Sequence, residues 1–352
     1  MSTLAALGGF GSWGFDLGRA FGRGWTIGSP AQLRGAAAIP TGTVIFGGSA
    51  RKKVAVEPDG LREFQAHRPR LFALAYRMLG SATEAEDAVQ ETYLRWDGTD
   101  RATIRSAEAW LSTAIVNLCR TWLVSARARR ETYVGPWLPE PVPTARGELG
   151  PLESVEEREL VSLALLTALE RLNPIERAVF VLREAFGYAH REIADMLAVS
   201  EANSQQIFRR ASVRVREGRP RFDVLPDQAR ELIERFLKAA RIGDVQGLER
   251  LLAADATSTA DGGGLVNAAR RPVVGAAAVA RYLAGLFRWA VPGMVITLEE
   301  INGALAVVVR LAGEPVLVVA VDILDEVVTA LRLIVNPEKL SYIGRVDGVA
   351  AQ

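Results

Sequence analysis

Residues 173 to 216 read NPIERAVFVLREAFGYAHREIADMLAVSEANSQQIFRRASVRVR. This stretch predicts three helices separated by two tight turns. Asn173 is a suitable N-cap, Pro174 fits the first helical turn, and Glu176 can return a hydrogen bond to the cap. Gly187 is expected to close the first helix, because glycine adopts the left-handed conformation at the least cost.

The second predicted helix covers about 189–197, and the third begins after Ser200, a good N-cap, and runs to about 215. Two helices joined by a short turn form a helix-turn-helix, whose second helix enters the DNA major groove. The third helix has two unlike faces. One face is expected to pack inward and carries Ser204, Phe208, Ala211 and Val215. The other carries Asn203, Gln205, Gln206, Arg209 and Arg210.

Amides and guanidinium groups can read base edges or hold phosphates, so the polar face of this helix indicates DNA binding. A solvated helix in an ordinary bundle is the alternative. DNA binding is favoured because the polar side chains gather on the helix that the motif assigns to the groove.

The composition is that of an ordinary soluble protein. The chain has 352 residues, 49% hydrophobic and 24% charged, with a formal net charge of +1, which allows two or three domains. A single cysteine, Cys119, excludes an internal disulfide and suits the reducing cytoplasm. Two histidines leave no His/Cys metal cluster, and no cofactor is expected. No apolar run reaches the roughly 18 residues of a membrane span.

Residues 1–57 are rich in glycine and show no clean hydrophobic period. They lack the apolar core of a signal peptide. We therefore expect a flexible extension.

Residues 58–130 predict a helical unit. An apolar stripe from Leu61 to Leu79 is expected to be interrupted or restarted at Pro69. A second helix follows, with a capping box at its start and an apolar stripe that includes Ala88, Val89 and Trp96. Its opposite face carries Glu86, Asp87, Gln90 and Glu91. On an isolated helix, such an acidic face would simply be solvated.

A further helix is expected over about 107–124. Asn117 and Arg120 lie off its apolar, tryptophan-containing stripe, and Arg127 follows in a basic run. Aromatic side chains beside a basic surface suit single-stranded nucleic acid, whose bases stack and whose phosphates need neutralising. The alternative is a core tryptophan flanked by solvated arginines.

Residues 131–157 are rich in proline and glycine, a composition that favours extended chain over packed structure. After Pro226 the pattern changes to helices at about 227–241, 244–254 and 276–289. Strand-like runs follow at 294–301, 304–311, 316–323 and 327–335, with Asn302-Gly303 as a strong hairpin turn. Helices against an antiparallel sheet predict an α+β cone.

Three pieces together resemble a known family: HRPRLFALAYRMLGSATEAEDAVQETYLRW, EAWLSTAIVNLCRTWL and the helix-turn-helix. They are similar to a bacterial extracytoplasmic-function sigma factor, and SARARRETYVGPWLPEP resembles the subgroup with a C-terminal SnoaL-like domain. The resemblance implies a multidomain protein: all-α sigma domain 2 (58–130), a linker (131–157) and sigma domain 4 (158–220), then an α+β SnoaL-like cone (226–345).

The resemblance also implies partners. The acidic face at Glu86, Asp87, Gln90 and Glu91 would bind the β′ clamp-helix region of RNA polymerase core, which also includes the β subunit. Asn117, Arg120 and Arg127 would open and read the −10 element of promoter DNA. The polar face of the third helix would read the −35 element. Two departures from the family pattern are Thr121-Trp122-Leu123-Val124 after the −10 asparagine, and Gln205 where a basic residue is common.

In the C-terminal unit, two motifs match the subgroup: Asp261-Gly262-Gly263-Gly264, and Asn336-Pro337-Glu338-Lys339-Leu340. The resemblance implies that this domain regulates the sigma part in the same chain, with one or both motifs near the contact. The triple glycine alone could equally be a flexible turn. Leu265 stands where relatives usually have lysine.

Two other functions remain open. The C-terminal cone could hold an unidentified small ligand or act as an enzyme, with Asp255, Asp261 or Asp322 as acid/base groups. No histidine lies near these aspartates in sequence, which favours regulation over catalysis. The third hypothesis is a ligand-responsive repressor or activator that binds duplex DNA without polymerase. Residues 61–130 favour the sigma factor, because only that function requires both an acidic helix and a strand-opening helix.

Overall fold

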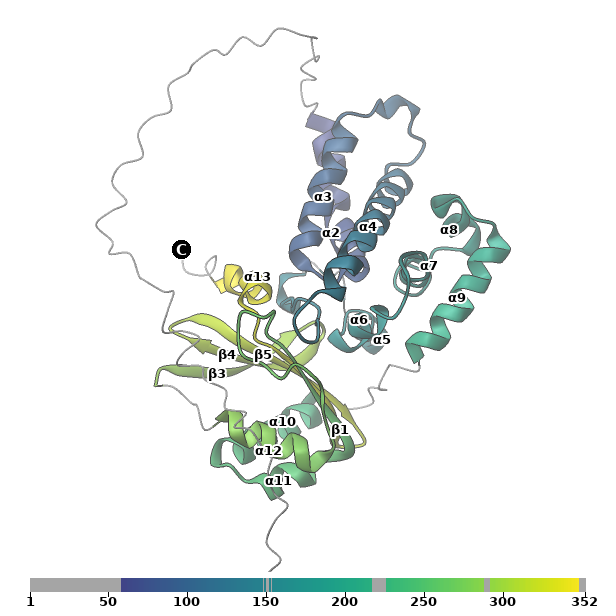
Figure 1. The fold of residues 1–352 in the computed structure, drawn as a ribbon. Coiled ribbons are helices and arrows are strands. Elements are labelled where there is room, and N and C mark those ends of the chain that lie inside the picture. Colours follow the sequence, from purple (N-terminus) through teal and green to yellow (C-terminus); the bar gives the residue numbers. More distant parts are fainter. Residues whose placement is uncertain are drawn as a thin grey trace, which may run out of the picture.

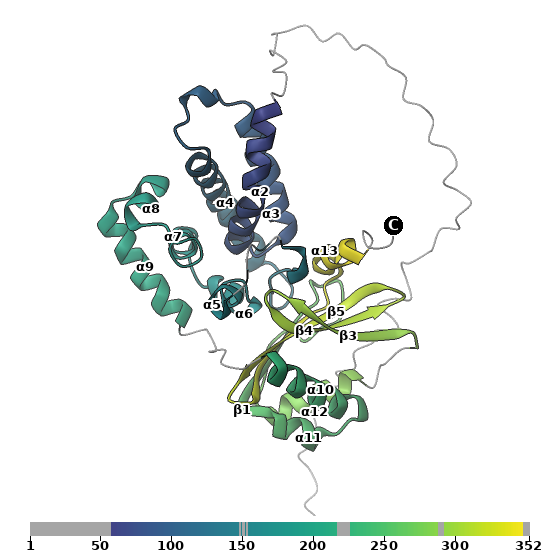
Figure 2. The same cartoon turned by 180° about the vertical axis from the view of Figure 1, so that it is seen from behind.

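A computed structural model describes residues 58–147, 149, 152, 154–216, 226–287 and 292–347 (Figures 1 and 2). The expectation for residues 1–57 lies outside these ranges. The described chain forms two helical units and a C-terminal unit of helices on a sheet, as predicted. Within these ranges, no helix is both long and apolar enough to cross a membrane.

The first helical unit consists of α2 (Pro58–Leu79), α3 (Ala82–Asp97), a short 3-10 turn η2 (Arg101–Thr103) and α4 (Ala107–Glu131). Contrary to expectation, α2 continues through Pro69. The residues after it, including Leu71, Phe72 and Tyr76, are fully buried against α3 and α4, and this packing outweighs the lost backbone hydrogen bond.

The helix α4 extends seven residues beyond its predicted end at Val124. Arg130, near its C-terminus, explains the added turns. Its guanidinium group pairs with Glu170 and donates a hydrogen bond to the Leu79 carbonyl (2.7 Å), so the last turns of α4 are held against neighbouring segments.

The second helical unit contains α5 (Val155–Glu159), α6 (Leu163–Leu169), α7 (Pro174–Glu184), α8 (His190–Leu197) and α9 (Glu201–Arg216). The predicted start of α7 is confirmed, because Asn173 and Glu176 form a reciprocal capping box. The turn between α8 and α9 places Ala198 in the left-handed conformation (φ 55°), and Ser200 accepts a hydrogen bond from the Asn203 amide (3.2 Å).

The inward face of α9 differs from the prediction at one position. Ile207 is 4% exposed, whereas Phe208 is only half-buried. Phe208 lies at the edge, where it stacks on Phe180 (ring centroids 6.2 Å apart) and meets the His190 ring edge-on. The sequence period allowed either residue to point inward.

The C-terminal unit begins with α10 (Pro226–Ile242) and α11 (Val245–Leu251), followed by strands β1 (Leu252–Asp261) and β2 (Val273–Val274) and helix α12 (Ala276–Phe287). Strands β3 (Met294–Ile301), β4 (Ala304–Leu311), β5 (Glu314–Leu324) and β6 (Val327–Ile334) complete the sheet, and α13 (Pro337–Asp347) ends the described chain. The strand order is β2-β1-β6-β5-β4-β3, with only the β1–β6 pair parallel.

The strand β1 was missed from sequence, where its first residues were assigned to a helix ending near 254. Its burial does not follow the strict alternation of a one-sided strand, because the register shifts between Leu252 and Thr257, and Thr257 and Thr259 are half-buried and not exposed. Its partner β6 lies more than 70 residues away in sequence, so no hairpin turn between the two strands could predict the pairing.

The two faces of the sheet have different partners. Helices α10, α11 and α12 cover one face, where they form a core with residues such as Val309, Val321 and Leu331 (Figure 1). The other face points toward the helical units, and Val308, Val318 and Ile334 belong to the same core as the helices of those units. The C-terminal unit is therefore packed onto the rest of the chain.

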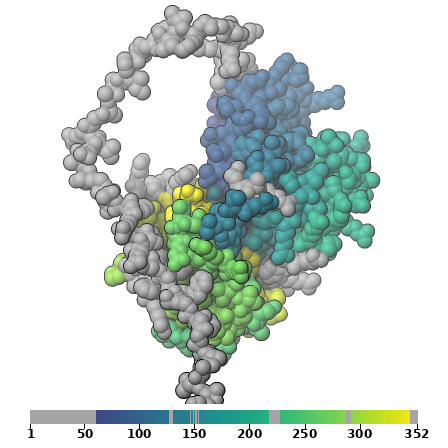
Figure 3. Space-filling model, in the orientation of Figure 1, coloured from purple at the N-terminus to yellow at the C-terminus, as the bar shows by residue number. Residues whose placement is uncertain are grey.

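The connecting segment, residues 132–147, corrects the expectation of an unpacked linker. Leu138 to Val142 are all buried, and a 3-10 turn η3 (Thr144–Arg146) follows. Figure 3 shows this dark teal part of the chain where the blue helices and the green C-terminal unit meet. The prolines keep the segment extended, as expected, and its middle part, Leu138 to Val142, is covered by the neighbouring units.

Candidate nucleic-acid interface and interdomain latch

The proposed base-reading face of α9 is open to solvent. Asn203, Gln205, Gln206, Arg209 and Arg210 are all exposed. Behind them, Ser204 is fully buried and hydrogen-bonds to the His190 ring (3.0 Å), while Arg214 pairs with Glu176 at the start of α7 (2.6 Å). These contacts fix the orientation of α9 and leave its polar face available.

The proposed −10 residues on α4 lie in a different environment. The Asn117 side-chain amide donates to the Thr113 carbonyl (3.0 Å) and to the Met196 carbonyl at the end of α8 (3.3 Å). Arg120 donates to the Asn117 side-chain oxygen (2.9 Å). Asn117 is thus bonded to the helix-turn-helix. The side chain of Arg127 lies outside the part of the chain that the structure describes.

Further contacts hold the two helical units together at α4. The Tyr188 hydroxyl donates to Ser112 (3.0 Å), and the Arg70 guanidinium lies over the rings of Phe186 and Tyr188 at 5.1 and 5.4 Å. Arg70 also pairs with Glu108 (3.2 Å). The α7–α8 turn therefore covers the start of the helix that carries Asn117.

The acidic face of α3 is opposite its buried stripe, as predicted. Asp87 and Gln90 are exposed. Glu86 and Glu91 are half-buried, with ion pairs to Arg68 (2.6 Å) and Arg95 (3.0 Å).

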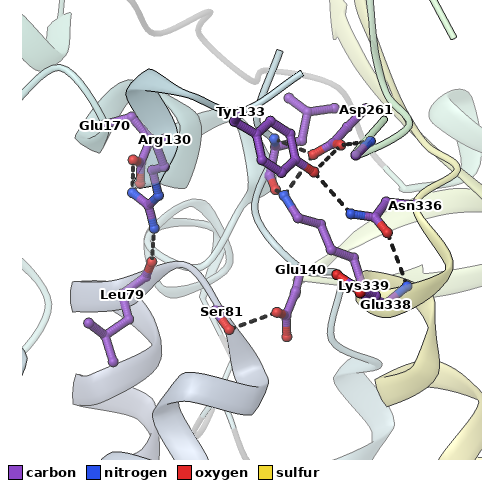
Figure 4. Close-up of polar contacts among 12 residues, drawn as sticks. Leu79, Ser81, Arg130, Tyr133, Glu140, Glu170, Asp261, Asn336, Glu338 and Lys339 are labelled. Carbon is purple, nitrogen blue, oxygen red and sulfur yellow. Dashed lines mark hydrogen bonds and ion pairs between the residues drawn. The ribbon is translucent and has the colours of Figure 1, made fainter. Parts of the chain in front are cut away.

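The two C-terminal motifs meet at one buried group, the Asp261 carboxylate (Figure 4). It is fully buried and accepts hydrogen bonds from the Tyr133 hydroxyl (2.6 Å) and the Leu138 amide (2.7 Å), both in the connecting segment. It also accepts from the Gly263 amide (3.1 Å) and pairs with Lys339 on α13 (2.7 Å). We call this group of contacts the latch, because it joins the C-terminal unit to the connecting segment.

Lys339 completes the latch from the α13 side. Its ammonium group also donates to the Leu138 carbonyl and lies 4.0 Å from the centre of the Trp137 ring. Burial lowers the pKa of Lys339, and the neighbouring Asp261 charge opposes that shift. Burial also raises the pKa of Tyr133, with a further contribution from its bond to Asp261, so its hydroxyl stays protonated and donates.

The remaining motif residues shape the same contact. Asn336 donates to the Tyr133 hydroxyl (2.9 Å) and accepts from the Glu338 amide (3.1 Å), and Pro337 begins α13. Gly263 has φ 61°, and a Cβ atom there would lie 2.3 Å from the Asn336 amide nitrogen. Glycine is needed at this position on both counts.

The other two glycines, Gly262 and Gly264, line a cleft of about 230 Å³ against Val134 and Gly135 of the connecting segment. The predicted regulatory residues Asp261, Gly262, Gly263, Gly264, Asn336, Pro337 and Lys339 are thus brought together, although the sequence separates the two motifs.

The sequence reasoning missed the partners of the latch in the connecting segment. Tyr133, Trp137 and Leu138 supply its hydroxyl, its ring and its backbone groups. The available signal was two aromatic residues within a proline-rich stretch, because a solvated linker does not need them. The sequence reasoning also missed a group of ion pairs. Glu170 pairs with both Arg130 and the buried Arg177, and its distance to Arg177 is 2.5 Å.

The three aspartates considered as acid/base groups do not form a site. The Asp261 carboxylate is already bonded to Tyr133 and Lys339 in the latch. Asp322 pairs with Arg332 (2.5 Å), and burial raises its pKa, whereas Asp255 is exposed. Among the residues described, no group of three or more His, Cys, Asp or Glu side chains could hold a metal ion.

Comparisons with known proteins assign the two helical units to known families. Residues 64–129 match the family model of sigma-70 region 2, and residues 162–215 match that of sigma-70 region 4. The ECF RNA polymerase sigma factor SigJ of Mycobacterium tuberculosis is 37% identical over 291 residues, 79% of this chain and 92% of SigJ. The probable ECF RNA polymerase sigma factor SigI of the same species is 31% identical over 281 residues, 79% of this chain and 93% of SigI.

The crystal structure of SigJ matches the fold with a TM-score of 0.62 and 32% identity, over 80% of this chain and 98% of that chain. The 291 residues aligned with SigJ outnumber those that precede Pro226, so the likeness extends into the C-terminal unit. The chain belongs to the ECF RNA polymerase sigma factors, the subunits that direct core polymerase to promoters.

Proposed function

We propose that this sigma factor reads the −10 element through Asn117 and Arg120 on α4, with Arg127 beyond them, and the −35 element through the exposed face of α9. We also propose that the acidic face of α3 binds the β′ clamp-helix region. The C-terminal unit regulates these activities by holding the chain closed, and it does so without catalysis.

The observation that carries the regulatory proposal is the hydrogen bond between Asn117 and the Met196 carbonyl. By their names, the −10 and −35 elements lie about 25 positions apart, which is roughly 85 Å of duplex at about 3.4 Å per base pair. Helices that are bonded to each other cannot reach two sites so far apart. The closed arrangement must therefore open before both elements are read.

The latch supports the assignment of the regulator to the C-terminal unit. Its carboxylate and ammonium groups bind the segment that connects the two helical units, and a tethered domain acts at a high effective concentration, on the order of millimolar for a short flexible link. The absence of catalysis is proposed because each candidate aspartate is paired, or is exposed away from the others.

The core-binding assignment is tested by replacing Glu86 and Asp87 together with alanine. Both lie opposite the buried Ala88/Val89 stripe, so we expect weaker capture of core polymerase and an unchanged fold. The control is the double replacement of Glu231 and Glu234, two exposed acidic residues on α10. Equal capture of core by wild type and by the Glu86/Asp87 variant would remove this face from the interface.

The −35 assignment is tested with Arg209→Ala. A bidentate contact from arginine to a base contributes roughly 1–3 kcal/mol of discrimination, whereas a phosphate contact affects all sequences alike. We expect Arg209→Ala to lower the affinity for a matched −35 element by a larger factor than the affinity for a scrambled one, measured by fluorescence anisotropy at one fixed salt concentration. Gln205→Ala should act in the same direction, and Arg241→Ala on α10 is the control. No loss on either duplex excludes Arg209 from the DNA contact.

A further inference from the structure

The tip of the β3–β4 hairpin is buried between both helical units. Asn302 is only 1% exposed, although hairpin turns usually face solvent. Its side-chain amide donates to the Tyr76 hydroxyl of α2 (2.8 Å) and to the Val161 carbonyl, between α5 and α6 (2.8 Å). Its side-chain oxygen accepts from the Val142 amide (2.9 Å), and its own amide donates to the Val142 carbonyl (2.9 Å). One residue thus contacts the first helical unit, the connecting segment and the second helical unit.

The neighbouring residue, Gly303, fits the same site closely. Its amide donates to the Thr144 hydroxyl (2.9 Å), and a Cβ atom there would lie 3.0 Å from the Arg158 Cα atom. Arg158 also pairs with Glu300 on β3 (2.6 Å). The Asn-Gly pair therefore has two roles: its positive φ angles of 53° and 74° form the turn, and its polar groups dock it.

Tyr76 links Asn302 to the start of α3 through a chain of hydrogen bonds. Its buried hydroxyl accepts from Asn302 and donates to the Glu140 carbonyl (2.6 Å). The Glu140 carboxylate in turn accepts from the Ser81 hydroxyl (2.7 Å) and the Thr83 amide (3.0 Å), as Figure 4 shows for Ser81. Ser81 is the N-cap of α3, the helix of the proposed core-binding face.

We infer that the Asn302–Gly303 hairpin tip is a clasp, through which the C-terminal unit holds both helical units in the closed arrangement and supports the N-terminal turn of α3. The site it occupies is built from Tyr76, Val142 and Val161, which belong to three different segments. This site exists only while the segments are together, so occupying it stabilises the closed form. The clasp is separate from the latch: in the part of the chain that the structure describes, the latch bonds to Tyr133 and Leu138 of the connecting segment, whereas the clasp bonds to α2 and to the α5–α6 junction.

The inference rests on the proposed regulatory role, and Asn302→Asp tests it in the full chain. Aspartate tolerates the left-handed turn, so the hairpin should still form. A carboxylate cannot donate to the Tyr76 hydroxyl or to the Val161 carbonyl. It would be buried facing that carbonyl, and the Tyr76 hydroxyl could donate to it only by giving up its bond to the Glu140 carbonyl. Because leaving buried polar groups unsatisfied is costly, we expect the open population to rise at least about tenfold.

The readout is the distance between dyes at Leu94→Cys on α3 and Val213→Cys on α9, both exposed positions, in a Cys119→Ala background. Ala312→Asp is the matched control. Ala312 has the same φ of 53° in the β4–β5 turn and is exposed. We expect a longer distance for Asn302→Asp only, together with faster hydrogen exchange at the Thr83 amide.

A second variant, Tyr76→Phe, leaves the C-terminal unit unchanged and removes one hydroxyl from the chain of bonds. Tyr76→Phe should also lengthen the distance between the two dyes. If Asn302→Asp fails to fold, this variant alone tests the clasp. Wild-type distance and exchange in the folded variants would overturn the clasp. If the chain opens and transcription stays the same, the clasp stands and the proposed regulation falls.

Discussion

Replacing Lys339 with methionine is expected to lower the free energy of unfolding by about 3–5 kcal/mol, because it leaves the Asp261 carboxylate buried without its cation. Asp261 is fully buried and Lys339 nearly so, which leaves solvent no room to screen the charge. The loss should appear in chemical denaturation as a lower midpoint.

The control for this prediction is Lys238→Met on α10. Lys238 is exposed, so its replacement should change stability by no more than about 0.5 kcal/mol. The double variant Asp261→Asn, Lys339→Met removes both charges and should recover part of the loss. A loss below about 1 kcal/mol for Lys339→Met would show that the buried pair does not stabilise docking.

Removing the C-terminal unit is expected to have the largest effect on transcription. A chain that ends at Asp223 lacks both the latch and the clasp, so nothing from the C-terminal unit holds the helix-turn-helix against Asn117. We expect at least about tenfold more promoter-specific transcript per folded molecule, equivalent to 1.4 kcal/mol.

A second truncation, ending just before Asn336, keeps the sheet and the clasp but removes α13 and Lys339. Its yield of promoter-specific transcript per folded molecule should lie between that of the full chain and that of the chain ending at Asp223. Helix α13 also packs on α2, where Tyr342 stacks on Phe72 (ring centroids 6.3 Å apart), so circular dichroism must first show that the truncated chains remain folded. Equal transcription and equal core binding by all three chains would rule out regulation by this unit.

The local features of the fold were predictable from sequence. The Asn173 capping box, the turn before α9 and the Asn302-Gly303 hairpin depend on neighbouring residues, and each formed as expected. The polar face of α9 was also predicted, because side-chain period determines which residues share a face.

The features that could not be predicted from sequence depend on contacts between distant segments. Strand β1 pairs with β6, and the connecting segment is packed because the Asp261 carboxylate and the hairpin tip bind its backbone. Composition predicts how a segment behaves in water, and it carries no information about a partner more than 70 residues away. The same limit hid the bond from Asn117 to the end of α8.

The order of the units along the chain has a consequence for synthesis on the ribosome. Domains of nascent proteins generally fold as units, the N-terminal ones first. Both helical units are complete at Arg216, whereas the latch needs Lys339 and the clasp needs Asn302. At about 5–20 residues per second, the interval between Arg216 and Lys339 lasts roughly 6–25 s. During that interval the nascent chain carries both helices that we propose to read DNA before the latch can form, so the speed of translation between Arg216 and Lys339 sets how long this restraint is delayed.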